Sequence, residues 1–120
     1  MYEYIGERQL FQKGSKKPES FAFPKYMLRA PVSQTAKMIY MLLLDRAMDK
    51  KSRDRIVLKD GKIRVVYMMK DLANDCGRGL TVIKDAVHEL ENAGLVKKYG
   101  FQGAKSEFCV YVKYPYDEDY

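Results

Sequence analysis

Between residues 78 and 92 the sequence places side chains that can bind nucleic acid on one side of an amphipathic pattern. The apolar residues Ile83, Ala86, Val87 and Leu90 recur at 3.6-residue spacing, which predicts a helix from about Leu80. The opposite side carries Arg78, Thr81, Asp85, His88 and Asn92, with Lys84 at its edge. Arginine and lysine can reach phosphates or guanine edges, and hydroxyl and imidazole groups can contact base edges. This predicted face therefore suits contact with duplex DNA.

Leu80 and Asp85 would contact DNA through other groups than the cations and hydroxyl groups above. Leu80 can touch the methyl group of a thymine if it is not packed inside the protein. The carboxylate of Asp85 repels phosphate, but it can accept a hydrogen bond from a cytosine amino group or orient a neighbouring lysine. A lone histidine such as His88 on a polar helix face is ordinarily just solvated, and no partner for a catalytic histidine is evident.

A second set of candidate contacts lies near the end of the sequence. Two strand-like segments, 96–99 and 108–112, flank a polar link with two glycines, which predicts a β-hairpin. Its candidate DNA contacts are Lys97, Lys98, Gln102 and Lys105. Lysines beside glycines at a hairpin tip suit contact with the DNA backbone or the minor groove.

The segment before residue 80 predicts how the polar helix is positioned. Met69, Leu72, Ala73 and Cys76 lie three and four residues apart, which is one face of a short helix. Gly77 ends this helix, since glycine tolerates the positive φ that follows many helix ends. The order of helix, glycine turn, helix and hairpin is that of a winged helix-turn-helix, whose second helix lies in the DNA major groove.

The middle of the chain predicts two further elements. Ser33 can cap a helix from about Gln34 to Asp49, and the run 38–44 is apolar around nearly the full circumference. That helix should be central, with the helix-turn-helix on one side and the N-terminal aromatic segment or a second subunit on another. Segments 56–58 and 63–67 flank Asp60-Gly61, a hairpin signal in which both turn positions need positive φ. The fold class is therefore α+β.

The two ends complete the expected organisation. Residues 1–10 could form a short extended arm, 13–20 an exposed loop, and 21–28 an aromatic stretch covered by the core or by a partner subunit. We expect an N-terminal arm and aromatic segment over 1–30, a winged helix DNA-binding domain over 31–114, and an acidic tail over 115–120.

Composition narrows the classes of function. The 120 residues are 47% hydrophobic and carry a net charge of +6, which fits one domain and favours a polyanion, though many ordinary proteins are equally basic. Cys76 and Cys109 lack metal-site spacing, and no apolar run is long enough to span a bilayer. The glycines at 77 and 79 lie between helices, not after a strand, so they make no nucleotide fingerprint. We expect a soluble cytoplasmic protein with no enzymatic activity, no cofactor and no metal.

Several segments also resemble a known family. Residues 23–25, 33–46, 60–63, 94–96 and 102–103 resemble the N-terminal domain of RepA-type plasmid replication initiators from Gram-positive bacteria, over about residues 20–113. The most specific piece is the helix that begins Ser-x-x-Ala-Lys and ends Leu-Leu-Leu-Asp-Arg. The resemblance implies a homodimer that binds repeated sites (iterons) at a plasmid origin and starts replication. Members of this family also carry a further C-terminal domain that engages host replication proteins. The resemblance implies the same partners, and this chain ends before such a domain.

This chain departs from the family pattern at the start of its second helix-turn-helix helix. Gly79 stands at the capping position that commonly holds serine, and Leu80 and Val82 take places that are often basic. Two other functions remain open from the sequence. A transcriptional repressor would share the DNA-reading parts, and a non-DNA module for protein interaction or dimerisation would share the fold.

Overall fold

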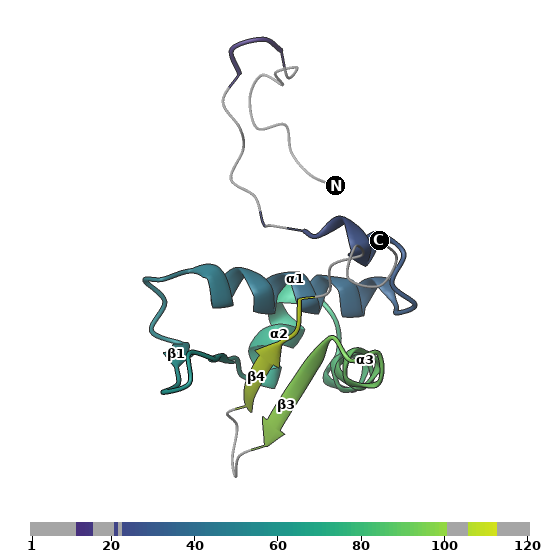
Figure 1. The fold of residues 1–120 in the computed structure, drawn as a ribbon. Helices are drawn as coiled ribbons and strands as arrows, with labels where there is room; N and C mark the ends of the chain where they lie inside the picture. The colour runs from purple at the N-terminus through teal and green to yellow at the C-terminus, as the bar shows by residue number, and fades with distance from the viewer. Residues whose placement is uncertain (1–11, 16–20, 22, 101–105, 113–120) are drawn as a thin grey trace, which may run out of the picture.

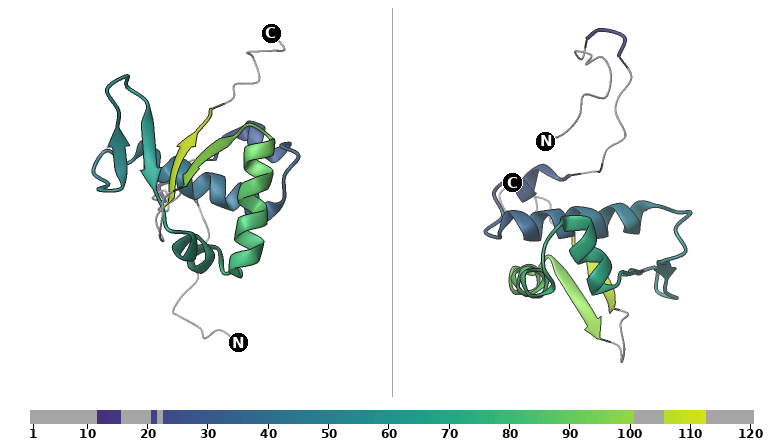
Figure 2. Two further views of the ribbon diagram at one scale, coloured as in Figure 1. Left: turned by 90° about the horizontal axis from the view of Figure 1, so that it is seen from below. Right: turned by 180° about the vertical axis from the view of Figure 1, so that it is seen from behind.

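The computed structural model describes residues 12–15, 21, 23–100 and 106–112. The elements in chain order are η1 (Lys25–Leu28), α1 (Gln34–Met48), β1 (Arg55–Val57), β2 (Ile63–Val66), α2 (Met69–Cys76), α3 (Leu80–Asn92), β3 (Val96–Gly100) and β4 (Ser106–Val110). Figure 1 shows α1 running horizontally above α2, α3 and the sheet, with α3 beside β3. The view from below in Figure 2 shows the β1–β2 hairpin on the side opposite α3. The predicted α+β winged helix-turn-helix is confirmed.

Helix α1 lies at the centre of the fold. Its N-terminus is capped as predicted, because the hydroxyl oxygen of Ser33 accepts a hydrogen bond from the N–H of Ala36 at 3.1 Å. Its buried stripe consists of Ala36, Ile39, Tyr40, Leu43 and Leu44. This stripe packs on α2, α3, β2 and β4, so the predicted central position is confirmed. The helix ends at Met48, one residue before the predicted end.

The N-terminal aromatic segment packs across α1 through a short 3₁₀ helix. In η1, Met27 is completely buried, and the hydroxyl of Tyr26 lies 2.6 Å from that of Tyr40. The ammonium group of Lys37 donates a hydrogen bond to the carbonyl of Leu28 at 3.1 Å. The domain's own core thus covers part of the segment, while Phe21 and Phe23 stay exposed.

Both hairpins belong to one antiparallel sheet with strand order β1-β2-β4-β3. The two hairpins were predicted, but their joining was not. It depends on pairing between β2 and β4, in which Val65 lies opposite Phe108. Both side chains are buried, as is Val96 on β3, so this face of the sheet closes the core beneath the helices. Pairing between strands forty residues apart leaves no local signal in the sequence.

The β1–β2 turn differs from its prediction. Gly61 has φ of 88°, but no other type of residue in the described segments has positive φ, so Asp60 does not adopt it. The N–H of Gly61 donates to the carbonyl of Leu58, and the N–H of Leu58 donates to the carbonyl of Lys62. The loop therefore has three residues, with glycine alone in the left-handed conformation. The expectation of positive φ at both Asp60 and Gly61 was wrong because Lys59 lengthens the loop.

Some predictions fall outside the described residues, namely the arm at 1–10, the loop residues 16–20 and the acidic tail at 115–120. Of the predicted loop at 13–20, the described part is exposed. Within the described ranges, no helix has the length and apolar character needed to cross a membrane. In those same ranges, no three His, Cys, Asp or Glu side chains are grouped so that they could hold a metal ion.

Candidate nucleic-acid interface

The turn between α2 and α3 is built on Gly77, as predicted. Gly77 has φ of 65° and ψ of 38°, the left-handed conformation in which a side chain is strained. Its N–H donates to the carbonyl of Asn74, and the N–H of Arg78 donates to that of Ala73, which together form a Schellman motif. Two residues later Gly79 returns to extended backbone, and α3 begins. This tight turn sets the direction of α3 relative to α2.

Helix α3 has one packed face and one exposed face. The packed face consists of Ile83, Ala86, Val87 and Leu90, all at most 3% exposed. The exposed side chains include every predicted contact of this segment, namely Arg78, Leu80, Thr81, Lys84 and His88, and also Asp85 and Asn92. Leu80 is not packed inside, so the condition attached to its prediction is met. The structure thus gathers the predicted reading residues on one accessible surface.

Two glutamates hold the edges of this exposed face. The carboxylate of Glu89 accepts hydrogen bonds from the N–H and the hydroxyl of Ser33, at 2.7 and 3.0 Å. The carboxylate of Glu91 accepts one from the backbone N–H of Lys98, at 3.1 Å. Helix α3 is therefore tied to the start of α1 on one side and to β3 on the other. These ties were not predicted, although both residues lie where the polar and apolar faces meet.

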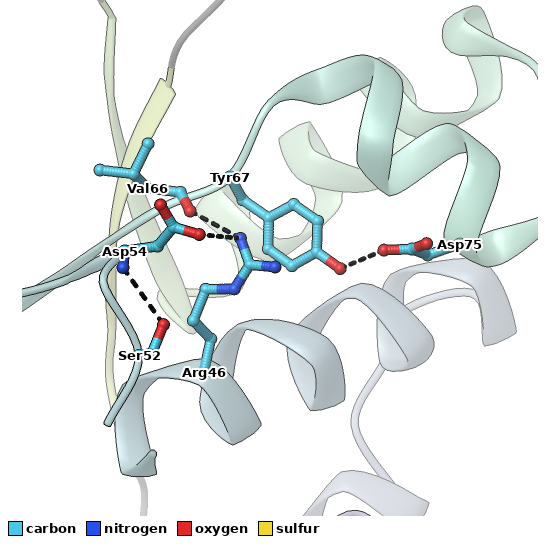
Figure 3. Close-up of polar contacts among 6 residues, drawn as sticks. All are labelled: Arg46, Ser52, Asp54, Val66, Tyr67 and Asp75. Carbon is cyan, nitrogen blue, oxygen red and sulfur yellow. Dashed lines mark hydrogen bonds and ion pairs between the residues drawn. The ribbon is translucent and has the colours of Figure 1, made fainter. Parts of the chain in front are cut away.

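A second polar network joins α1, the end of β2 and α2 (Figure 3). The guanidinium of Arg46 lies 3.7 Å from the centre of the Tyr67 ring and donates to the carbonyl of Val66 at 2.8 Å. The hydroxyl of Tyr67 donates to the carboxylate of Asp75 in α2. Burial and this hydrogen bond raise the pKa of Tyr67 well above its ordinary value, so the hydroxyl keeps its proton. The network fixes α2 against α1.

A pocket of about 540 Å³ opens beside this network, and the described residues that line it include none of α3. Its lining residues are Phe21, Leu42, Asp45, Arg46, Asp49, Ser52, Asp54, Tyr67 and Asp75. Four carboxylates face a single guanidinium there, and Arg46 is already paired with Asp54 at 3.4 Å. Such a surface repels phosphate. The pocket is therefore not part of the candidate nucleic-acid interface.

The β3–β4 hairpin forms the predicted wing. Lys97 is exposed, with its ammonium group 5.3 Å from the centre of the Tyr99 ring, whereas Lys98 is half-buried. The predicted contacts Gln102 and Lys105 lie outside the described residues. Of the predicted wing lysines in the described part of the chain, Lys97 is therefore the one that is exposed to solvent.

The prediction missed a cation on the neighbouring strand. Arg64 of β2 lies with its guanidinium 3.9 Å from the centre of the Tyr99 ring, and pairs with Glu107 at 3.3 Å. Since Val65 points into the core, the alternation of side chains places Arg64 on the outer face of the sheet. The pairing with Glu107 neutralises its charge, so it supports the wing more than it attracts DNA.

The two cysteines lie at the end of α2 and on β4. Cys76 is buried in the core at the end of α2, and burial raises the pKa of its thiol. Cys109 on β4 is partly exposed, and neither forms a disulfide. Both behave as small side chains of the scaffold rather than as part of the exposed face of α3.

Two solved structures share this fold. One, described as "Structure of Rep-DNA complex", has 20% sequence identity, covers 78% of this chain and 75% of that chain, and has a TM-score of 0.62. The other, described as "Structure of MDR initiator", has 22% identity, covers 78% of this chain and 77% of that chain, and has a TM-score of 0.64. No protein-family model and no curated protein matches the sequence. At these identities the likeness concerns the fold, an α+β winged helix-turn-helix.

Proposed function

We propose that this chain binds duplex DNA in a sequence-specific manner, with α3 in the major groove and the β3–β4 hairpin against the backbone. The observation that carries the proposal is the exposed face of α3, held at a fixed angle by the Gly77 turn and at its edges by Glu89 and Glu91. Thr81 and His88 are placed for base edges, Arg78 and Lys84 for phosphates or guanine, and Lys97 for phosphates.

The biological role that we propose is initiation of plasmid replication. The sequence resembles RepA-type initiators, and the fold is similar to that of one chain described as a Rep–DNA complex and another described as an initiator. In this role residues 31–114 are the DNA-binding domain, acting as a homodimer on repeated sites at the origin. Host replication proteins would be engaged by a separate C-terminal domain. We propose no catalytic activity, cofactor or metal for this chain.

Selection from a random duplex pool tests DNA recognition. We expect a recurring sequence that the protein binds at least tenfold more tightly than an unrelated duplex of the same length at the same salt concentration. Thr81→Ala should reduce this ratio, because a good base contact contributes about 1 to 3 kcal/mol. The control is Lys59→Ala, which removes an exposed lysine from the loop after β1. Strand β1 forms the edge of the sheet opposite β3, so this lysine lies away from the wing. An unenriched pool, or binding that is insensitive to salt, would favour the protein-interaction module.

A replication assay separates the initiator from a repressor of the same architecture. A plasmid that carries repeats of the selected sequence should replicate only when the protein containing this domain is supplied. Repression of a promoter by the same repeats, without any support of replication, would assign the chain to transcription instead.

A further inference from the structure

The first turn of α3 leaves two large apolar side chains in solvent. Leu80 is 44% exposed and Val82 is 45% exposed, and they flank the exposed Thr81. The same helix buries Ile83, Ala86, Val87 and Leu90 almost completely, so its packing face is already filled. The apolar residues at 80 and 82 are therefore surplus to the core, and they lie at the end of the helix that follows the Gly77 turn.

This end of a recognition helix is the part that meets base edges. Residues 79–83 contain no arginine, lysine, asparagine or glutamine, which are the side chains that ordinarily make bidentate hydrogen bonds to bases. One guanidinium nitrogen of Arg78, just before the helix, donates back to the carbonyl of Gly77 at 3.3 Å. The next cation, Lys84, lies a full turn further along. The first turn can thus offer bases one hydroxyl and several methyl groups.

The major groove displays one apolar feature, the C5-methyl group of thymine, and apolar side chains and the threonine methyl contact it. We propose that Leu80, Thr81 and Val82 recognise thymines through these methyl groups, so that specificity depends on apolar contact more than on hydrogen bonds. This inference rests on the proposed binding of duplex DNA. It deepens that function by naming the chemical group that is read.

Three cations around the first turn favour DNA over a protein as the partner of these side chains, against one carboxylate, Asp85, a turn beyond Thr81. Arg78 and Lys84 are exposed on either side of the first turn in the sequence, and Lys97 is exposed on the wing. Exposed methyl groups with cations nearby match a thymine-rich groove that is bordered by phosphates. Failure to bind any duplex in the following experiment would leave contact with another protein as the role of these residues.

The test replaces thymine by uracil, which removes the methyl group and leaves the hydrogen-bonding edge unchanged. The duplex selected from the random pool is prepared with thymine, and with uracil at one position at a time, and binding is measured by fluorescence anisotropy at fixed salt. We expect about fourfold weaker binding for each contacted thymine, the change expected from burying one methyl-sized group. Equal affinity at every position would overturn the inference while leaving DNA binding intact. Failure to bind any duplex would overturn the proposed function, and the inference with it.

Variants assign the effect to these side chains. Leu80→Ala and Val82→Ala change exposed residues, so we expect both to fold with unaltered circular dichroism. Each should move the thymine-to-uracil affinity ratio at one position towards one. Lys97→Ala, the matched control, should weaken both duplexes and leave the ratio unchanged. If the ratio survives Leu80→Ala, Val82→Ala and Thr81→Ala alike, the methyl groups act through the shape of the DNA and the proposed contact is wrong.

Discussion

The carboxylate of Glu89 accepts two hydrogen bonds from Ser33, which lies fifty-six residues earlier in the chain. The hydroxyl of Ser33 donates to Glu89, while its oxygen accepts from the N–H of Ala36. One side chain thus caps α1 and ties it to α3. The exposed face of α3 therefore depends on a contact at the N-terminal end of the central helix α1.

Replacing Ser33 by alanine should lower the free energy of unfolding by about 1 to 2 kcal/mol, since the helix cap and the hydroxyl bond to Glu89 are lost together. Ser33→Thr retains the hydroxyl and serves as the control. Urea denaturation followed by circular dichroism measures both. Equal midpoints for Ser33→Ala and the unmodified protein would mean that this contact does not contribute to stability.

The two glycines of the turn should respond differently to alanine. Gly77 has φ of 65°, so Gly77→Ala should destabilise the protein by about 1 to 2 kcal/mol. Gly79 has φ of −72°, with no atom within 4 Å of an added Cβ. Gly79→Ala should therefore be close to neutral, because the lower entropy of the unfolded chain offsets the poorer N-cap preference of alanine. Thermal unfolding of both variants makes the comparison. Similar losses at the two positions would contradict the conformation assigned to Gly77.

Tyr67→Phe should reduce stability at neutral pH by about 1 kcal/mol, because the hydrogen bond to Asp75 is lost. The pKa of Tyr67 is raised in the folded state, so the stability from this group is present below the unfolded pKa of about 10 and is lost as the pH rises towards the folded pKa. The advantage of the unmodified protein over Tyr67→Phe should therefore shrink between pH 7 and about pH 11. Urea midpoints of both proteins at the two pH values give the answer, and an advantage that grows with pH would exclude a raised pKa.

Lys97→Ala should weaken binding to selected and unrelated duplexes by a similar factor, because a wing lysine contacts the backbone and not the bases. The slope of log affinity against log salt should fall by about one, the change expected for one phosphate contact. Lys59→Ala should leave the slope unchanged. A selective loss of the preferred sequence in Lys97→Ala would instead place this lysine among the base-reading residues.

The sequence predicted elements that have a local signature. The apolar periodicity around Ile83 and Leu90 predicted α3. Ser33 predicted the start of α1, and Gly77 predicted the turn between α2 and α3. These features depend on residues within one or two helical turns of each other, so their pattern is visible in a single sequence.

Contacts between distant segments had no such signature. The pairing of Val65 with Phe108 and the ties from Glu89 to Ser33 and from Glu91 to Lys98 arise only when the helices and sheet come together. A glutamate at the edge of a helix is compatible with solvent as well as with a distant N–H group. The exposure of Leu80 likewise could not be settled before the direction of α3 was known.

The most direct test of the account is to map the surface that meets DNA. Amide chemical shifts of the ¹⁵N-labelled protein would be followed while the selected duplex is added at low salt. We predict the largest changes at residues 78–88 and at Lys97, with small changes over β1 at the opposite edge of the sheet. Unchanged α3 amides, with shifts concentrated on α1 or β1, would contradict the assignment of α3 as the DNA-reading helix.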